Sequence, residues 1–225
     1  RRRRPGAPPG RRRALPAAIQ RRAANRLLQQ LRKLPEFRRA RHIALYSASD
    51  GEISTTDVLR YCQRRGKVCY LPVIHRDTKH AQMRFHRHAP GQTLRNNAFN
   101  IPEPNALRRR QIDPLRLDMN LLPLVGFDRR GNRLGMGGGY YDRTLSFTQR
   151  APDSHSFSVS KTPKLVGIAH DIQEVDALPS TAQCYATLPP ANLNTASGWG
   201  QRDPLVGDSL VSWTDLERAS TFDSG

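Results

Sequence analysis

The chain has 225 residues, of which 37% are hydrophobic, and carries a formal net charge of +18 at pH 7. This length suits one domain with a sizeable core, and no apolar run approaches the roughly 18 residues that span a bilayer, so we expect no membrane segment. The charge raises nucleic acid as a partner, but residues 1–13 alone hold seven arginines and no acid. The other arginines are scattered and do not alternate with aromatic residues, so we expect nucleic acid to be contacted only through this basic arm, if at all.

The amino-terminal part predicts a basic arm, a helix and a strand. We expect residues 1–10, which are rich in arginine, proline and glycine, to be disordered. A helix over 15–34 ends at Pro35, and a strand follows over 42–46. The apolar face of this helix consists of Ile19, Ala23, Leu27, Leu31 and Leu34.

The next part predicts a second helix, a parallel strand and a histidine-rich hairpin or loop. The helix covers 55–65 and ends at Gly66, and the strand over 67–73 pairs in parallel with the first strand, as β-helix-β units do. The hairpin or loop over 75–88 holds His75, His80, His86 and His88. Because no acidic or cysteine partner lies near them at a helical spacing, we interpret them as surface histidines rather than as a metal site.

Residues 121–145 read LLPLVGFDRRGNRLGMGGGYYDRTL and carry the strongest functional pattern. A core strand over 118–127 and a polar turn over 128–132 lead into a glycine-rich loop and the start of a helix. The glycines lack Cβ atoms, so this backbone can take positive φ angles and surround an anion with successive N–H groups. Asp142 is then either a carboxylate favoured by the helix dipole or a ligand for phosphate-bound Mg²⁺. The alternative is a glycine hairpin with tyrosines packed beneath it.

A last core strand over 165–169 completes the alternation of helices and strands. This order predicts a single α/β domain, a Rossmann-like layered fold with a mostly parallel central sheet. The three cysteines, Cys62, Cys69 and Cys184, are odd in number and lack a metal-binding spacing. They indicate reduced thiols in a cytoplasmic protein.

Seven collinear blocks give the chain a close resemblance to the 5-formyltetrahydrofolate cyclo-ligase family. Besides the 121–145 segment, the blocks are RRRAL (11–15), YSASDGEIST (46–55), GKVCYLPVI (66–74), MRF (83–85), NIPEP (100–104) and VGIAHDIQ (166–173). They occur in the order of the family and at roughly its spacing. The resemblance implies a cyclo-ligase-like α/β domain over 11–179, which follows the basic arm over 1–10 and precedes a tail over 180–225 that diverges from the family and that we expect to be poorly ordered.

The resemblance implies a monomeric enzyme that uses ATP and Mg²⁺ to cyclise 5-formyltetrahydrofolate to 5,10-methenyltetrahydrofolate, releasing ADP and phosphate. Transfer of the γ-phosphoryl group to the formyl oxygen makes that oxygen a good leaving group, and N10 then attacks the formyl carbon. The protein would position two ligands and neutralise charge, which suits a phosphate cradle without a nucleophile-base pair. The folate substrate can carry a polyglutamate chain.

Site residues carry over from the family only where the motifs match. The ATP phosphates would be bound by Arg133, Leu134, Gly135, Met136, Gly137, Gly138, Gly139, Tyr140 and Tyr141. Asp142 would hold Mg²⁺, and Tyr140 would be catalytic, with its hydroxyl near the reacting formyl group. The folate would contact Ser47, Glu52, Met136, Gly137, Gly138, Gly139 and Tyr140. Glu52 would bind the N–H groups of the pterin, its alternative role being a carboxylate at the start of the helix over 55–65.

The sequence departs from the family at both ends. A basic pair that grips ATP phosphates in relatives falls on Arg1 and Pro5, so the second position does not match. After Pro179 the chain lacks the aspartate that helps to bind Mg²⁺ in relatives, and we expect it to lack their last hydrophobic strand. Two alternatives to the cyclo-ligase activity therefore remain: a catalytically impaired relative that binds folate or nucleotide, and a basic nucleic-acid-binding protein on the same fold.

Overall fold

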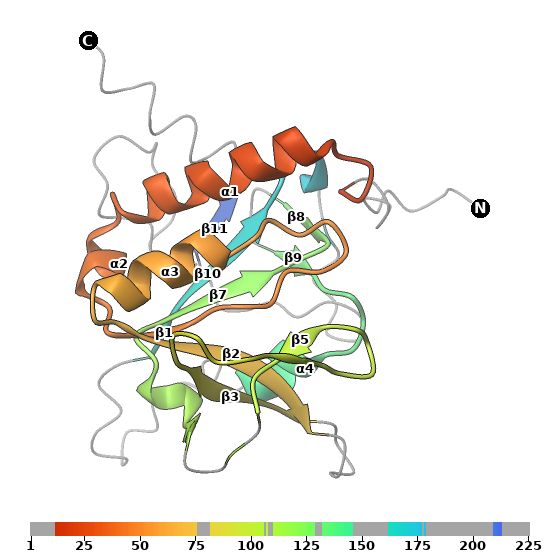
Figure 1. The fold of residues 1–225 in the computed structure, drawn as a ribbon. Coiled ribbons are helices and arrows are strands. Elements are labelled where there is room, and N and C mark those ends of the chain that lie inside the picture. The colour runs from red at the N-terminus through yellow and green to blue at the C-terminus, as the bar shows by residue number, and fades with distance from the viewer. Residues whose placement is uncertain are drawn as a thin grey trace, which may run out of the picture.

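A seven-stranded sheet in the order β11-β10-β7-β1-β2-β3-β6 forms the centre of the computed structural model (Figure 1). The structure describes residues 12–75, 82–105, 107, 110–128, 132–145, 162–176, 178 and 209–212. The predicted arm over 1–10, His80, Cys184 and most of the predicted tail lie outside these residues. The strands are β1 (His42–Ala44), β2 (Val68–His75), β3 (Gln82–His88), β6 (Gln111–Ile112), β7 (Met119–Pro123), β10 (Lys164–Ala169) and β11 (Ser209–Ser212).

Strand pairing confirms the predicted α/β fold with a mostly parallel sheet. Strands β11, β10, β7, β1 and β2 run parallel, with His42 opposite Val68 at the start of the β1–β2 pair. Strand β3 is antiparallel to β2, which confirms a hairpin in the histidine-rich segment, and β6 is antiparallel to β3. Two small sheets lie outside the central one: β4 (Arg95–Asn96) with β5 (Pro102–Glu103), and β8 (Gly126–Phe127) with β9 (Arg133–Leu134).

Apolar clusters cover both faces of the sheet. Helices α1 (Ala17–Leu31), α2 (Pro35–Arg39) and α3 (Thr56–Arg64) lie along one face in Figure 1. Ala23, Leu27 and Val58 from these helices pack with Ile43 and Leu121 of the sheet in one buried cluster. Helix α4 (Tyr140–Thr144) packs against the other face, where its tyrosines meet a second cluster. None of the described helices is both long and apolar enough to cross a bilayer.

The first helix differs from its predicted extent. It ends at Leu31, and Pro35 begins α2 rather than ending α1. A proline is well placed there, because the first turn of a helix does not use the missing N–H and the ring already fixes a helical φ. Ile19 was predicted on the buried face but is 48% exposed, since it lies in the first turn and the buried positions begin at Ala23.

The predicted strand over 118–127 is divided into β7 and β8. Between them, the carbonyl oxygen of Leu124 accepts hydrogen bonds from the side chains of Arg12 and Gln173, and that of Val125 accepts one from Gln173. Side chains thus bind the carbonyls at this point, so the chain can leave the central sheet without burying unpaired polar groups. The turn over 128–132 is confirmed at its ends, where the N–H of Asn132 donates to Asp128 Oδ1 at 2.9 Å.

The sequence prediction was wrong about a strand beyond Pro179. Strand β11 pairs in parallel with β10, with Val166 opposite Ser209 and Ala169 opposite Ser212. An edge strand such as β10 presents a row of N–H and C=O groups that a further strand can pair with. The segment over 180–208 is rich in Ser, Thr, Pro and Gly, which are typical of loops, so the composition offered no reason to expect this short strand after it. The two described cysteines, Cys62 and Cys69, are free and buried, as predicted for packing thiols.

Candidate active site

The two predicted parts of the site meet at the carboxyl edge of the parallel strands. The 45–55 segment follows β1, and the segment from Leu124 through the β8–β9 hairpin to α4 follows β7. In Figure 1, β1 and β7 both point toward the side of the molecule where β8 and β9 lie. Ligands in open α/β sheets bind at this edge, because the loops that leave neighbouring strands diverge there and form a crevice.

The loop after β1 makes a tight turn that only glycine permits at one position. Asp50 and Gly51 have φ angles of 53° and 74°. A Cβ atom on Gly51 would lie 2.6 Å from the carbonyl oxygen of Arg12, far closer than atoms tolerate. Within the turn, the N–H of Ser49 donates to Glu52 Oε2 at 3.0 Å, and the N–H of Glu52 donates to the carbonyl of Ser49 at 2.9 Å. This turn fixes the Glu52 carboxylate.

Arg12 joins the loop after β1 to the chain after β7. Its guanidinium is 2% exposed and donates to Asp50 O at 2.7 Å, Asp50 Oδ2 at 2.9 Å and Leu124 O at 2.7 Å. It also lies 3.6 Å from Glu52 Oε1. A buried cation requires such partners, since it has lost its hydration. Sequence reasoning placed Arg12 in the RRRAL block but assigned it no role.

Two glutamines hold the same loops, and sequence reasoning missed both. Gln20 Nε2 donates to the carbonyls of Arg12 at 3.1 Å and Gly51 at 3.0 Å. Gln173 Nε2 donates to the carbonyls of Leu124 at 2.6 Å and Val125 at 3.1 Å. Only the VGIAHDIQ block, which contains Gln173, signalled that this region matters. The site edge is therefore a hydrogen-bonded framework rather than a set of free loops.

Glu52 is a largely buried carboxylate at the centre of this framework. Its side chain is 8% exposed, and burial raises its pKa, while the N–H of Ser49 and the charge of Arg12 lower it. It does not cap α3, because Thr55 occupies the N-cap and donates its hydroxyl to the carbonyl of Tyr46 instead. The alternative role at the helix start is thus wrong, and the carboxylate instead accepts the N–H of Ser49.

Two tyrosine hydroxyls lie within the electrostatic reach of Glu52. Burial raises the pKa of Tyr46 well above its usual value, and the charge of Glu52 raises it further. Burial and then Glu52 also raise the pKa of Tyr141, while Arg133 lowers it. Tyr141 thereby connects the carboxylate after β1 with α4 and the glycine loop. The charge of Glu52 therefore acts on residues of both predicted parts of the site, the loop after β1 and helix α4.

The glycine loop has the backbone form that the sequence predicted at two of its four glycines. Gly137 and Gly139 have φ angles of 90° and 61°, and Gly139 forms the N-cap of α4. Within the described part of the chain, the N–H groups of residues 135–139 donate no hydrogen bond. Met136 is 69% exposed beside them. Five backbone donors are thus open to a ligand, and an anion is the group that such a loop binds.

Arg143 braces the glycine loop, another role that sequence reasoning missed. Its guanidinium donates to the carbonyl of Gly138 at 2.8 Å and lies 5.3 Å from the centre of the Tyr140 ring. Thr144 Oγ1 donates to the carbonyl of Met83 at 3.2 Å, which fastens α4 to β3. Tyr140 and Tyr141 pack against the cluster that contains Phe85. The loop is therefore held at its base while its N–H groups stay open.

Arg133 and Asp142, two predicted ligand-binding residues, form an ion pair with each other. Arg133 is 4% exposed and donates through Nη2 to Asp142 Oδ1. Its buried Nε has no hydrogen-bond partner among the residues that the structure covers. Asp142 Oδ2 likewise accepts no hydrogen bond there. The pair thus presents one carboxylate oxygen beside the glycine loop that is free of hydrogen bonds from the described residues, whereas the Nε of Arg133 is buried.

Ser47 and residues of the MRF and NIPEP blocks are tied into the scaffold. Ser47 Oγ donates to the carbonyl of Pro102 at 2.6 Å, which links the loop after β1 to β5. Met83 and Phe85 are 5% and 0% exposed, so they pack in the core rather than on a ligand. Glu103 accepts from the N–H of Ile74 at 3.1 Å and from Asn97 Nδ2 at 2.6 Å. These contacts shape the wall beside the site.

The prediction of surface histidines was wrong for two of the four. His86 and His88 alternate on β3 and are 1% and 9% exposed, because β3 is an inner strand between β2 and β6. Burial lowers the pKa of His88. No group of three His, Cys, Asp or Glu residues suited to a metal occurs among the described residues.

Fold and site together define a class: an α/β domain with a glycine-rich loop of open N–H groups and a buried carboxylate at the carboxyl edge of its sheet. Comparison with known sequences identifies the particular family. The sequence model of the 5-formyltetrahydrofolate cyclo-ligase family matches residues 9–183. The 5-formyltetrahydrofolate cyclo-ligase of Haemophilus influenzae is 41% identical over 167 residues, 74% of this chain and 83% of the relative. The Escherichia coli K12 enzyme is 38% identical over 170 residues, covering 75% and 87%. The chain belongs to the 5-formyltetrahydrofolate cyclo-ligase family.

Solved structures agree with this assignment. The NMR structure of Aquifex aeolicus 5,10-methenyltetrahydrofolate synthetase matches with a TM-score of 0.61 and 29% identity, over 78% of this chain and 80% of that one. A 5,10-methenyltetrahydrofolate synthetase from Mycoplasma pneumoniae matches with a TM-score of 0.54 and 25% identity, over 76% and 85%. The predicted family and fold are confirmed.

Proposed function

We propose that the chain is an ATP- and Mg²⁺-dependent enzyme that converts 5-formyltetrahydrofolate to 5,10-methenyltetrahydrofolate, ADP and phosphate. The observation that carries the proposal is the meeting of two different sites at one edge of the sheet. Open N–H groups in the glycine loop suit a phosphate chain, and the buried Glu52 carboxylate suits the N–H groups of a pterin. A reaction between ATP and a folate requires such neighbours.

The reaction proceeds by activation of the formyl oxygen. This oxygen forms a bond to the γ-phosphorus of ATP, and the bond between that phosphorus and the β–γ bridging oxygen breaks to release ADP. The N10 lone pair then attacks the formyl carbon, N10 loses its proton, and the C–O bond breaks with phosphate as the leaving group. The protein contributes alignment and charge stabilisation, the main sources of catalysis in phosphoryl transfer.

The phosphate chain of ATP would lie against residues 133–141. The open N–H groups of residues 135–139 would supply donors for its oxygens, and the buried guanidinium of Arg133 would add positive charge beside them. Asp142 would hold Mg²⁺ through its open oxygen. A single carboxylate fits this ion, because Mg²⁺ takes its other ligands from substrate phosphates and water. The ion would neutralise charge that develops on the phosphate oxygens.

The folate would lie between the glycine loop and the loop after β1. Glu52 would accept hydrogen bonds from the pterin, Ser47 would border it, and the 136–140 segment would cover it. Tyr140 would donate its hydroxyl to the formyl oxygen and so hold that oxygen in line with the γ-phosphorus. Tyr141 is the competing donor, since its hydroxyl lies within reach of the Glu52 charge.

Formation of the methenyl product, followed by its absorbance, tests the proposed function. Product should form only when ATP, Mg²⁺ and 5-formyltetrahydrofolate are all present. A protein that binds ATP and 5-formyltetrahydrofolate by calorimetry but makes no product at high concentration would be the impaired relative instead. Tight, salt-dependent RNA binding that survives removal of residues 1–10 would favour the nucleic-acid alternative.

We also propose that the enzyme acts as a monomer in the cytoplasm and that its catalytic domain covers residues 11–179, with β11 adding an edge strand to its sheet. The buried free thiols of Cys62 and Cys69 fit a reducing compartment. Light scattering of the purified chain at catalytic concentrations measures the oligomeric state. Limited proteolysis with mass spectrometry locates the boundaries of the resistant domain.

A further inference from the structure

A cavity lies at the opposite edge of the sheet from the glycine loop. Its volume is about 560 Å³, within the range of small-molecule sites. The lining includes His42, the first residue of β1, and Tyr70, near the start of β2. The amino ends of the parallel strands therefore border this cavity, whereas Glu52 and the glycine loop follow their carboxyl ends. We call it the amino-edge pocket.

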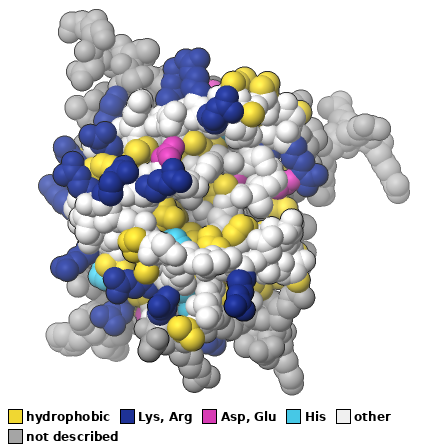
Figure 2. All heavy atoms as spheres, viewed as in Figure 1, with side chains coloured by type: hydrophobic (Ala, Val, Ile, Leu, Met, Phe, Trp, Pro, Cys, Tyr) yellow, Lys and Arg dark blue, Asp and Glu magenta, His cyan; other side chains and the backbone are white. Residues whose placement is uncertain are grey.

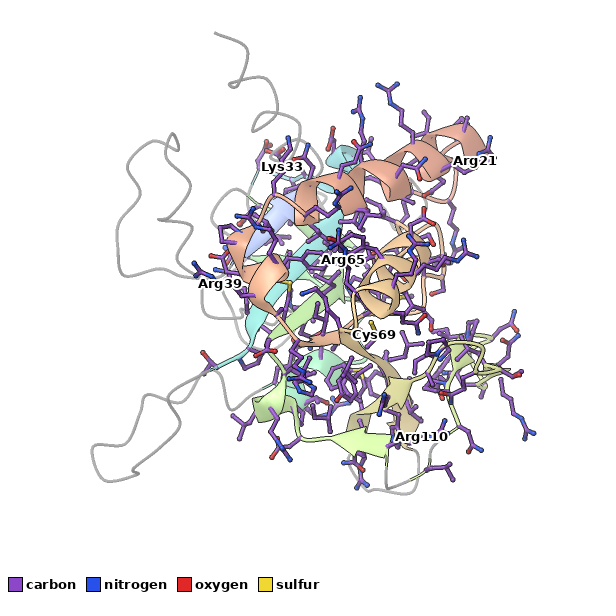
Figure 3. All side chains as sticks on the ribbon, turned by 60° about the vertical axis from the view of Figure 1, so that its left-hand side comes forward. Arg21, Lys33, Arg39, Arg65, Cys69 and Arg110 are labelled. Atoms are coloured by element: carbon purple, nitrogen blue, oxygen red, sulfur yellow. The ribbon has the colours of Figure 1, made fainter. Side chains whose placement is uncertain are left out.

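The amino-edge pocket carries an excess of positive charge. Arg87, Arg110 and Arg116 all line it, and none of the three forms an ion pair within the part of the chain described. One acid, Asp113, also lines the pocket, but its Oδ1 accepts the N–H of Leu115 at 3.0 Å. Figure 3 shows Arg110 at the lower end of the sheet, far from Arg21 on α1. In Figure 2, several Lys and Arg side chains lie on the side where β1 and β2 begin.

The positive charges of the amino-edge pocket surround a hydrogen-bonded pair, Tyr70 and His42. Tyr70 Oη lies 2.9 Å from His42 Nδ1. Burial raises the pKa of Tyr70, while the charges of Arg87 and Arg116 lower it, so both guanidinium groups act on this hydroxyl. A ligand at this point would meet cations together with the Tyr70 and His42 side chains. Ile112 adds an apolar patch to the lining.

Paired strands hold Tyr70, Arg87 and Ile112 of the pocket. Tyr70 and Arg87 are direct cross-strand partners on β2 and β3, so their side chains project from the same face. Ile112 lies opposite Phe85 in the β3–β6 pair, and Arg84 Nη1 donates to Gln111 Oε1 at 3.4 Å. Groups on paired strands keep their spacing, which favours selective binding over a diffuse basic surface.

We propose that the amino-edge pocket binds a small anion with at least two charged groups, phosphates or carboxylates, at a site separate from the glycine loop. The planar guanidinium group binds either kind of oxyanion through two parallel hydrogen bonds. The three guanidinium groups around this cavity, which form no ion pair with the described residues, provide for more than one such group. The proposal does not depend on the proposed reaction, because the pocket shares no residue with the candidate active site.

The proposal is tested by titrating the ¹⁵N-labelled full chain with pyrophosphate and, separately, with citrate. Saturable amide shifts at Gln111 and Ile112 are expected with at least one probe. Tighter binding of pyrophosphate would assign the natural ligand to the organic phosphates, and tighter binding of citrate to the polycarboxylates. Shifts confined to Gly137 and Gly139, or no saturable shift with either probe, would overturn the proposal.

Two variants that lose the same charge distinguish binding in the pocket from nonspecific attraction to a basic protein. Replacing Arg87, Arg110 and Arg116 together by Gln should weaken binding at Gln111 and Ile112 by roughly tenfold or more, because charge-assisted hydrogen bonds are lost. Replacing Arg21, Arg38 and Arg39 by Gln lowers the net charge equally but should leave that affinity within about twofold. Should the pocket triple variant not fold, Arg110→Gln alone should still weaken binding. Equal affinity in the pocket and control variants would overturn the proposal.

Discussion

The buried guanidinium of Arg12 donates a hydrogen bond of 2.7 Å to the carbonyl oxygen of Leu124, 112 residues further along the chain. The same side chain binds the backbone and the carboxylate of Asp50 in the loop after β1. One side chain thus sets the distance between the two loops that follow β1 and β7. The candidate active site depends on a residue that need not touch a ligand.

Replacing Arg12 with Met should therefore destabilise the fold and misplace the site. The change leaves Asp50, Glu52 and the Leu124 carbonyl without a buried donor, which costs about 3–5 kcal/mol of unfolding free energy. Urea denaturation measures this cost. Arg13→Met is the matched control: Arg13 also pairs with Asp50, but its side chain is 66% exposed, so the cost should stay below about 1 kcal/mol. Equal costs for the two variants would contradict a structural role for Arg12.

Strands, helices and their order could largely be predicted from hydrophobic patterning, because the long helix buries one face and the central strands β7 and β10 are apolar runs buried on both faces. The break between β7 and β8 could not, because Leu124 and Val125 are as apolar as their neighbours. What ends β7 there is hydrogen bonding from Arg12 and Gln173, both distant in sequence. Burial of Arg12 itself was equally hidden, since its neighbours Arg11 and Arg13 are the same residue type.

The candidate site was predictable where backbone chemistry restricts the residue type. Positive φ at Gly137 and Gly139 follows from the tolerance of glycine for that region. The pairing of Arg133 with Asp142 was not predictable, because it depends on how α4 packs back onto the hairpin. Glu52 was placed through the family resemblance, while its surroundings, Arg12 and Tyr141, came only from the structure.

Gly137→Ala should weaken ATP binding by straining the loop. Nothing lies within 4 Å of a Cβ at this position, so the cost comes from the φ of 90° alone, about 1–2 kcal/mol or roughly tenfold in affinity. Calorimetry with ATP measures it. Gly135→Ala is the control, because its φ is not positive and its new Cβ would make only an ordinary contact with Arg133 at 3.8 Å. A larger loss for Gly135→Ala would contradict the role of positive φ.

The Glu52→Gln variant should bind the substrate more weakly than the wild type. Its stability relative to the wild type should increase as the pH rises. Because burial raises the folded-state pKa of Glu52 above its ordinary 4.5, the folded protein holds a proton that the unfolded chain has released in that window. The ionised carboxylate therefore costs wild-type stability as pH climbs through the window, whereas the amide does not titrate.

Urea denaturation of both proteins, from below pH 4.5 to neutrality, measures the difference in unfolding free energy. This difference should increasingly favour the Gln variant as the pH rises above 4.5, and it should be constant at lower pH. A shift in the opposite direction would show that Arg12 and Ser49 outweigh burial. Affinity for 5-formyltetrahydrofolate should fall by about tenfold or more, since a neutral amide replaces a charged acceptor of the pterin N–H groups.

Tyr140→Phe should lower turnover by roughly 100-fold with little loss of stability, because only a hydroxyl that stabilises charge at the formyl oxygen is removed. Steady-state kinetics measures kcat and KM separately, and thermal unfolding reports stability. Tyr141→Phe is the matched comparison, as it keeps the ring that packs beside Leu145. If Tyr141→Phe loses the turnover and Tyr140→Phe keeps it, the catalytic hydroxyl belongs to Tyr141.

Asp142→Asn should raise the Mg²⁺ concentration needed for half-maximal turnover by about tenfold or more, because the neutral amide oxygen binds this hard cation weakly. The variant also leaves Arg133 without its acidic partner, at a stability cost of about 1–3 kcal/mol, so turnover must be measured well below the unfolding temperature. Asp57→Asn changes an acid on α3 whose side chain is 37% exposed; it makes the same change of charge and should leave the Mg²⁺ titration unchanged. If Asp142→Asn keeps the wild-type titration while losing stability, the carboxylate serves only to hold Arg133 against the glycine loop, and Mg²⁺ is bound through ATP and water alone.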